Sequence, residues 1–270
     1  NGYGGFAKDG KEYVVILSPG KNTPAPWSNV IANPTFGTVV SESGGAYTWL
    51  ENSHEFRVTP WYNDPVKDTS GEAIYIRDEE TGNYWSPTPL PVRGKTPYVV
   101  RHGFGYTVFE HTEYDITSEL WIYVAMDAPV KFTVLKLYNR SERPRRISMT
   151  GYYEWVMGDT RTRNLLHIRT EADAKTGVLY ARNPYNADFS EKIAFLDAGN
   201  LRAVTGDRRE FIGQNGNLSQ PAAMQKKRLS GNTGAGMDPC GAVQIFMELQ
   251  PGERRKARIL LGGAGSEDDK

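Results

Sequence analysis

The chain has 270 residues and only one cysteine, Cys240, so it cannot form an internal disulfide. No group of Cys and His residues has the spacing of a zinc site, and a reducing compartment is therefore the simpler expectation. The chain also lacks an excess of either charge, with 32 Lys and Arg against 32 Asp and Glu. Phosphate binding is largely charge neutralisation, so balanced charge disfavours nucleic acid and anionic membranes as main partners.

Long apolar runs and catalytic signatures are missing as well. The longest apolar run, from Leu120 to Met126, is far shorter than the roughly 20 residues of a spanning helix, so we expect no membrane insertion. There is no nucleophile elbow, Walker loop, His-Glu-x-x-His or calcium loop, so we predict no catalytic residue and no metal ligand. The N-terminus has neither an initiator Met nor a signal sequence, which predicts a piece of a longer polypeptide.

What the sequence does contain is short β-branched and aromatic runs, separated by many of its 28 Gly and 16 Pro residues. Thirteen such runs are predicted strands: 12–17, 36–41, 46–50, 73–77, 98–101, 106–111, 116–124, 131–138, 146–155, 178–182, 192–196, 242–249 and 257–261. Helices do not alternate with them. The pattern predicts an all-β protein, a large antiparallel β-sandwich with one or two short helices.

Turn residues between periodic segments predict two β-hairpins, one through residues 137–144 and one through residues 249–253. Residues 219–229, with Pro221 near the start and basic residues at the end, predict a two-turn helix. We place the sandwich at residues 1–262. The small and charged residues 263–270 read as the start of a linker.

Polar and aromatic residues gather in three predicted loops, at residues 54–65, 83–87 and 100–106. Sugars offer hydroxyl groups that suit Arg, Asp and Asn, and apolar C–H faces that suit aromatic rings, so each loop has the chemistry of a sugar contact. The simpler interpretation of Trp61, Tyr84 and Trp85, taken singly, is a role in the core or at a strand edge.

The other ionisable groups are most simply interpreted as structural. Of the four histidines, only His102 stands beside an Arg and next to a glycine turn. Glu154 and Asp159 have the makings of a carboxylate pair for glycosidic chemistry, but a charged strand end is the simpler interpretation. Arg143, Arg145 and Arg146 are most simply solvated turn charges.

Seven segments together resemble the N-terminal sandwich domain of glycoside hydrolase family 94, the family of cellobiose and chitobiose phosphorylases and of the phosphorylase-like region of cyclic β-1,2-glucan synthases. They are NGYGGF at 1–6, PWSNVIAN at 26–33, the stretch from ENS at 51–53 to ND at 63–64, YIRD at 75–78, YWSP at 84–87, RHGFGY at 101–106 and TGAGMDPC at 233–240. The second and third of these segments are closest in sequence to the cyclic β-1,2-glucan synthases.

The resemblance implies a galactose-mutarotase-like super-sandwich that packs on an (α/α)6 catalytic barrel, which residues 263–270 would lead into. The barrel carries the family's acid and its inorganic phosphate site, so we expect no catalysis and no cofactor in this chain itself. Arg101 and His102 best match the family's sugar-contacting motif, and Arg57, Trp61, Asn63 and Asp64 are weaker candidates.

The implied partners are a β-glucan oligosaccharide and the barrel, with self-association into a homodimer left open. The implied location is the cytoplasmic face of an inner-membrane multidomain protein.

Two other hypotheses remain. One is a self-standing mutarotase-like epimerase, in which His102 or His167 would work with Glu154. The other is a purely structural domain for dimerisation and packing.

Overall fold

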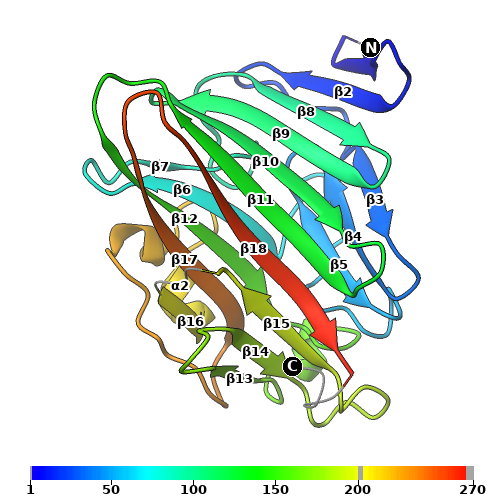
Figure 1. Ribbon diagram of the computed structural model, residues 1–270. Coiled ribbons are helices and arrows are strands. Elements are labelled where there is room, and N and C mark those ends of the chain that lie inside the picture. Colours follow the sequence, from blue (N-terminus) through cyan, green and yellow to red (C-terminus); the bar gives the residue numbers. More distant parts are fainter. Residues whose placement is uncertain (1, 200–202, 266–270) are drawn as a thin grey trace.

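Antiparallel strands form three sheets in the structure, a computed structural model that describes residues 2–199 and 203–265 (Figure 1). The largest sheet has ten strands, in the order β1 (Gly4–Phe6), β2 (Glu12–Leu17), β8 (Tyr98–Gly103), β9 (Tyr106–Glu113), β10 (Ile116–Val124), β11 (Val130–Asn139), β18 (Arg254–Ala264), β15 (Ile193–Asp197), β14 (Leu179–Arg182) and β13 (Arg169–Ala172). The five-stranded sheet follows the order β16 (Ala203–Asp207), β17 (Pro239–Leu249), β12 (Arg145–Glu154), β6 (Glu72–Asp78) and β7 (Tyr84–Trp85). The third sheet is β3 (Ser28–Ala32), β4 (Phe36–Ser41) and β5 (Ala46–Leu50).

The predicted all-β sandwich is therefore confirmed, and each of the thirteen predicted runs overlaps a strand. The strands that the sequence did not reveal, β1, β3, β7, β13 and β16, have two to five residues. Runs of that length give little periodicity to detect. The last strand, β18, continues to Ala264, so the first residues of the predicted linker belong to the sandwich. Residues 266–270 of that linker lie outside the described residues.

Among residues 2–199 and 203–265, helical structure is limited to α1 (Arg161–Asn164), α2 (Arg208–Ile212) and the 3₁₀ helix η1 (Ala222–Gln225). The helix predicted over residues 219–229 is wrong in extent, because only η1 forms there. Ala223, Met224 and Leu229 pack instead in a second core, against Tyr75 and Tyr152 of the five-stranded sheet. Within the described ranges, no helix is long and apolar enough to cross a membrane.

The two predicted hairpins are wrong in a more informative way. β11 pairs with β10 and β18 in the large sheet, whereas β12 pairs with β17 and β6 in the five-stranded sheet. The turn between β11 and β12 therefore carries the chain from one sheet to the other, and the turn between β17 and β18 carries it back. The Asn139 side chain links the two turns by donating hydrogen bonds to the carbonyl oxygens of Arg143 (2.8 Å), Leu249 (3.1 Å) and Gln250 (3.1 Å).

A buried ion pair joins all three sheets. Lys131 of β11 is 1% exposed, and its Nζ lies 2.5 Å from Glu72 Oε2 of β6. The same Nζ donates to the hydroxyls of Thr38 of β4 and Thr48 of β5, both at 3.1 Å. Glu72 Oε1 accepts hydrogen bonds from Thr48 and from Thr59. Every polar atom of this cluster thus has a partner, as burial requires.

We expect Lys131→Met to lower the free energy of unfolding by about 3 to 5 kcal/mol, because Glu72 would be left as an uncompensated buried charge. The matched control is Lys136→Met on the same strand. Its ammonium pairs with Glu119 but is half exposed, so the loss should stay below about 1 kcal/mol. Urea unfolding measures both values, and similar losses in the two variants would contradict the role given to Lys131.

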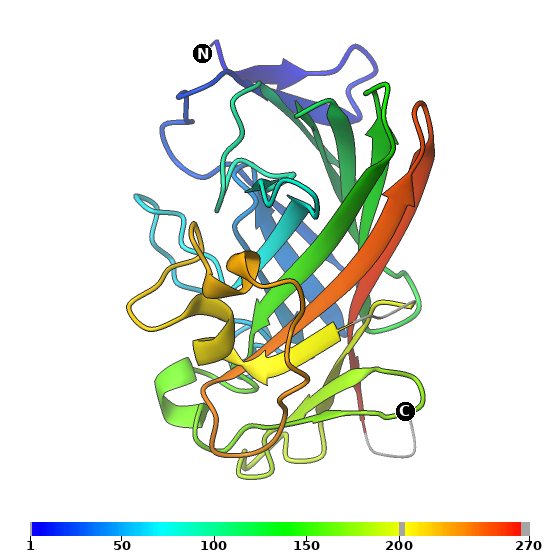
Figure 2. The same ribbon diagram turned by 90° about the vertical axis from the view of Figure 1, so that its left-hand side faces the viewer.

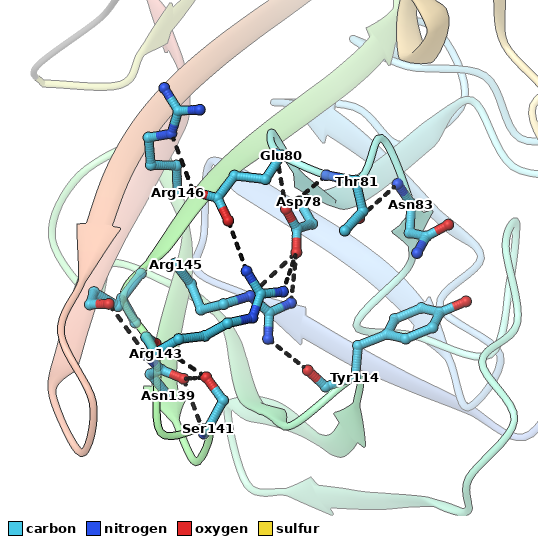
Figure 3. A network of polar contacts seen from close by, with 11 residues as sticks. Asp78, Glu80, Thr81, Asn83, Tyr114, Asn139, Ser141, Arg143, Arg145 and Arg146 are labelled. Carbon is cyan, nitrogen blue, oxygen red and sulfur yellow. Dashed lines mark hydrogen bonds and ion pairs between the residues drawn. The ribbon is translucent and has the colours of Figure 1, made fainter.

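A second polar network lies around the end of β6 and the start of β12 (Figure 3). Arg145 is buried and donates to Asp78 Oδ2 from Nε at 3.1 Å and from Nη2 at 2.6 Å, while its Nη1 donates to the Tyr114 carbonyl oxygen at 2.8 Å. Arg143 and Arg146 are exposed at their guanidinium ends and pair with Glu80. The interpretation of all three arginines as solvated charges is therefore wrong for Arg145.

The Asp78 carboxyl also accepts hydrogen bonds from two backbone N–H groups, those of Glu80 and Thr81. Burial raises the pKa of Asp78. The Glu80 N–H, the Arg145 guanidinium and the Thr81 N–H outweigh burial, so the pKa of Asp78 lies below its ordinary value. The charged carboxylate therefore stabilises the fold.

We predict that Arg145→Met costs about 3 kcal/mol or more of unfolding free energy, because Asp78 loses its buried counter-charge. Arg146→Met, at the exposed neighbouring position, should change it by less than about 0.5 kcal/mol. Since the folded-state pKa of Asp78 is depressed, its stabilisation is present above the unfolded pKa of about 3.9 and is lost as the pH falls through the lower folded value. Urea titrations of the wild type and Asp78→Asn at neutral and acid pH should therefore converge in acid, and a constant difference would contradict the assignment.

Candidate functional site

Arg101 and His102 are neighbours on β8 and point to opposite faces of the large sheet, as strand geometry requires. The Arg101 guanidinium lies on the outer face. Its Nη1 is 3.2 Å from Glu12 Oε1, its Nη2 is 2.7 Å from Glu110 Oε1, and it lies 6.0 Å from the centre of the Trp121 ring. About a quarter of its side chain is exposed.

His102 faces inward, and both of its ring nitrogens have protein partners. Nδ1 is 2.9 Å from the Thr107 hydroxyl and Nε2 is 3.0 Å from the Trp27 carbonyl oxygen. Burial lowers the pKa of His102, although the Trp27 carbonyl opposes the shift, and this favours the neutral ring. In this arrangement His102 has no nitrogen left for a ligand and cannot share one cleft with Arg101.

The weaker candidates lie elsewhere, in and before the loop of residues 61–70. Arg57 pairs through its backbone with Gly158, and its Nη1 donates to the Asp159 carbonyl oxygen at 3.2 Å. Trp61 is 40% exposed and packs against Tyr47 with ring centres 4.9 Å apart. Asn63 is exposed with a positive φ, and Asp64 Oδ1 accepts from the N–H groups of two following residues, Val66 and Lys67. The six predicted residues therefore do not form a single site.

A cleft of about 520 Å³ lies between this loop and residues 212–219, and we call it the Glu154 cleft. Glu154 is the last residue of β12 and lies in the wall of this cleft. Each of its two carboxylate oxygens contacts two partners. Oε1 accepts from the Tyr62 hydroxyl (2.9 Å) and is 2.5 Å from Arg161 Nε. Oε2 accepts from the Tyr152 hydroxyl (3.1 Å) and from Arg208 Nε (3.2 Å).

Asp238 closes this network, because it pairs with both Arg161 and Arg208. Burial, and then the Glu154 carboxylate, raise the pKa of Tyr62, which keeps its phenol protonated as a donor. A carboxylate has about four acceptor positions, and those of Glu154 are taken. Glu154 is therefore a structural hydrogen-bond acceptor and is not free to act as a base.

Asp159 has different partners and does not share those of Glu154. It accepts hydrogen bonds from the Thr160 N–H at 2.7 Å and from the Asn164 amide at 3.0 Å, and it pairs with Arg163 at 2.5 Å. These contacts outweigh desolvation and hold the pKa of Asp159 below its ordinary value.

Asp159 instead lines a second, polar cleft of about 370 Å³, which we call the His167–Tyr185 cleft. The rings of His167 and Tyr185 lie 4.7 Å apart, and Tyr185 is 71% exposed. The backbone pairing of Arg57 with Gly158 brings Glu55 to the same cleft. The remaining lining residues are Arg163, Asn164, Asn186, Ala187, Asp188 and Phe189.

Sequence reasoning missed Tyr185 and Asn186, although their signal was present. They follow a predicted strand in the stretch Asn183-Pro184-Tyr185-Asn186, which has the same mixture of turn, polar and aromatic residues as the three loops that were singled out.

Comparison with known proteins identifies the family. Residues 11–270 match the supersandwich domain of glycosyl hydrolase 94. The chain belongs to this family. It is 38% identical to the cyclic β-(1,2)-glucan synthase NdvB of Rhizobium meliloti over 99% of its own length, and 31% identical to the N,N'-diacetylchitobiose phosphorylase of Vibrio furnissii over 96%. The aligned region spans 10% of the synthase and 33% of the phosphorylase.

Solved structures resemble this glycosyl hydrolase 94 domain in fold alone. A putative aldose 1-epimerase of Escherichia coli K12 superimposes with a TM-score of 0.51 and 7% identity, covering 89% of this chain and 99% of that protein. A bacterial glucoamylase superimposes with a TM-score of 0.51 and 8% identity, covering 95% of this chain and 36% of the glucoamylase. The chain therefore shares the sandwich fold of these proteins, although the sequences are not similar.

We predict that this glycosyl hydrolase 94 domain does not accelerate the interconversion of sugar anomers. The Glu154 oxygens and the His102 nitrogens are already bound within the protein, so neither group can take or give the proton. Polarimetry of freshly dissolved α-glucose should follow the uncatalysed rate. A faster rate that Glu154→Gln abolishes would contradict this assignment.

Proposed function

We propose that the chain is an accessory carbohydrate-binding and docking domain of a cyclic β-1,2-glucan synthase. The similarity to NdvB over nearly the whole chain supports this choice of parent. In this proposal an (α/α)6 barrel elsewhere in the parent holds inorganic phosphate and the acid, and it carries out the inverting phosphorylase-type chemistry. The sandwich lends contacts to the glucan, on the cytoplasmic face of an inner-membrane protein.

The His167–Tyr185 cleft is the observation that carries the sugar-binding half of the proposal. An exposed Tyr185 ring offers an apolar face for the C–H groups of a pyranose. Beside it, the exposed Arg163 guanidinium can donate hydrogen bonds to sugar hydroxyls. Asp159 and Asn186 already accept hydrogen bonds within the protein and make the rest of the lining polar. Arg57 supports the cleft from behind through the Asp159 carbonyl oxygen.

The rim of the Glu154 cleft supports the docking half. Trp61, Tyr62, Val66 and Leu90 are exposed apolar residues in the loops that border this cleft. Exposed aromatic and aliphatic residues grouped around a hollow are typical of an interaction surface. The chain spans a third or less of the relatives named above, so their remaining length leaves room for the barrel as the occupant. Asn63 and Asp64 shape the loop that carries Trp61 and Tyr62.

We expect the chain to bind sophorose and longer β-1,2-glucans weakly, and Tyr185→Ala to weaken that binding by about three- to tenfold, because a ring contact is lost. Phe6→Ala is the matched control, since Phe6 is 76% exposed and lies on β1, at the opposite edge of the ten-stranded sheet from β13 and β14. Isothermal titration calorimetry measures both affinities.

Arg101→Ala completes the test of the predicted site. If Arg101 contacts glucan in the parent, its loss lowers the activity of the full-length synthase while leaving binding at the His167–Tyr185 cleft unchanged. If neither Tyr185→Ala nor Arg101→Ala alters binding or activity, the sugar-binding half of the proposal is wrong and the domain only docks.

A further inference from the structure

The balanced charge of the chain conceals a basic surface at the start of β18. Ala257 and Ile259 of this strand are buried in the core, so the alternating residues Arg254, Lys256 and Arg258 face outward. In the sheet register they stand opposite Tyr138, Lys136 and Val134 of β11, whose side chains share that outer face. Three cations therefore follow one another along a single strand.

These cations are not neutralised by the protein. Among the described residues, no carboxylate pairs with Arg254, Lys256 or Arg258, whereas neighbouring Lys136 is paired with Glu119 and Arg255 with Glu253. Arg254 lies over the Tyr138 ring at 5.1 Å, and Arg140 lies over the same ring at 5.4 Å. We call Arg140, Arg254, Lys256 and Arg258 the β18 basic face.

A groove adjoins this face where β18 lacks a second neighbour. β15 pairs with β18 only from Leu260 onward, so over residues 254–259 the strand pairs with β11 alone within the described residues. The groove has a volume of about 560 Å³ and runs between this free edge and β17. Arg255, Lys256 and Arg258 line one side, and Phe246, Met247 and Glu248 line the other, so three cations face one carboxylate.

We propose that the β18 basic face binds the surface of a bilayer that contains anionic lipids. Four exposed cations on a sheet face and its adjoining turn match the number and the open arrangement that hold proteins to anionic headgroups. The groove offers room for a headgroup phosphate beside apolar side chains. A single-stranded nucleic acid would need several free aromatic rings for base stacking. The Tyr138 ring beside this face is already covered by two guanidinium groups, and only Phe246 of the described groove residues adds another ring.

Binding in this way orients the domain. Figure 2 shows β18 on the opposite side of the molecule from α2 and η1, with α1 at the lower end. The Glu154 cleft is lined by α2 and the residues after it, and the His167–Tyr185 cleft by α1 and its surroundings. A domain held by the β18 basic face keeps both clefts directed away from the lipid. The lipid contact does not depend on sugar binding at either cleft.

The test is flotation of the chain with vesicles of phosphatidylcholine alone and with vesicles that also contain phosphatidylglycerol. We expect flotation only with the anionic vesicles, and its loss as salt rises from about 0.1 M to about 1 M, because the screening length falls from about 10 Å to about 3 Å. The triple variant Arg254→Glu, Lys256→Glu, Arg258→Glu should bind at least about tenfold more weakly. The milder triple substitution to Gln should give an intermediate loss and serves if the first variant does not fold.

The matched control carries the same charge change at exposed lysines on other loops, as Lys175→Glu, Lys226→Glu, Lys227→Glu. It should retain vesicle binding within about twofold, because the contact is local to one face. Equal loss in both triple variants would overturn the proposal, as would flotation with neutral vesicles or none with anionic ones. A short single-stranded DNA serves as competitor, and binding of this DNA in preference to anionic vesicles would also overturn the lipid assignment.

Discussion

The ion pair between Lys131 and Glu72 is the contact on which the arrangement of the three sheets depends. Each sheet supplies part of it, because the Lys131 ammonium reaches Glu72 in the five-stranded sheet and two threonines, Thr38 and Thr48, in the three-stranded sheet. Hydrophobic contacts fill the space between sheets but set no particular register. A buried charge with a fixed set of partners does, since any sliding of one sheet would leave it unpaired. Glu72 also lines the Glu154 cleft, so the same contact fixes the wall of that cleft.

The sequence predicts most of the strands and misplaces their connections, for a physical reason. Periodicity and turn residues report where a strand begins and ends, and these are local properties. Which sheet a strand then joins depends on distant partners. The turn after Asn139 has the composition of a hairpin, but the strands on either side belong to different sheets. The Asn139 amide makes this crossing possible by satisfying backbone carbonyls in both turns, and nothing near Asn139 in the sequence indicates those contacts.

The same dependence on distant partners explains why the sequence does not show which site residues lie together. Composition indicates loops with sugar-binding chemistry, but residues adjacent in the sequence are not always adjacent in space. Arg101 and His102 are separated by the sheet itself, whereas Arg57 and Asp159 meet although they are 102 positions apart in the sequence. Arg145 looked like its exposed neighbours because only its pairing with Asp78, from another strand, reveals that it is buried. The sequence therefore predicts which residue types take part, but it does not predict the faces of the sheets on which they meet.

Net charge is subject to this limit too. A sum of zero excludes a uniformly basic protein, but it does not describe how the charges are distributed. In the fold, acidic side chains are drawn into pairs, as Glu154 is with Arg161 and Arg208, while the cations at the start of β18 are left facing outward. The pairing of acidic side chains in the interior and around the clefts thus leaves one face of a neutral chain basic. If that face meets lipid, a domain of no net charge can be oriented at a membrane without any segment that enters it.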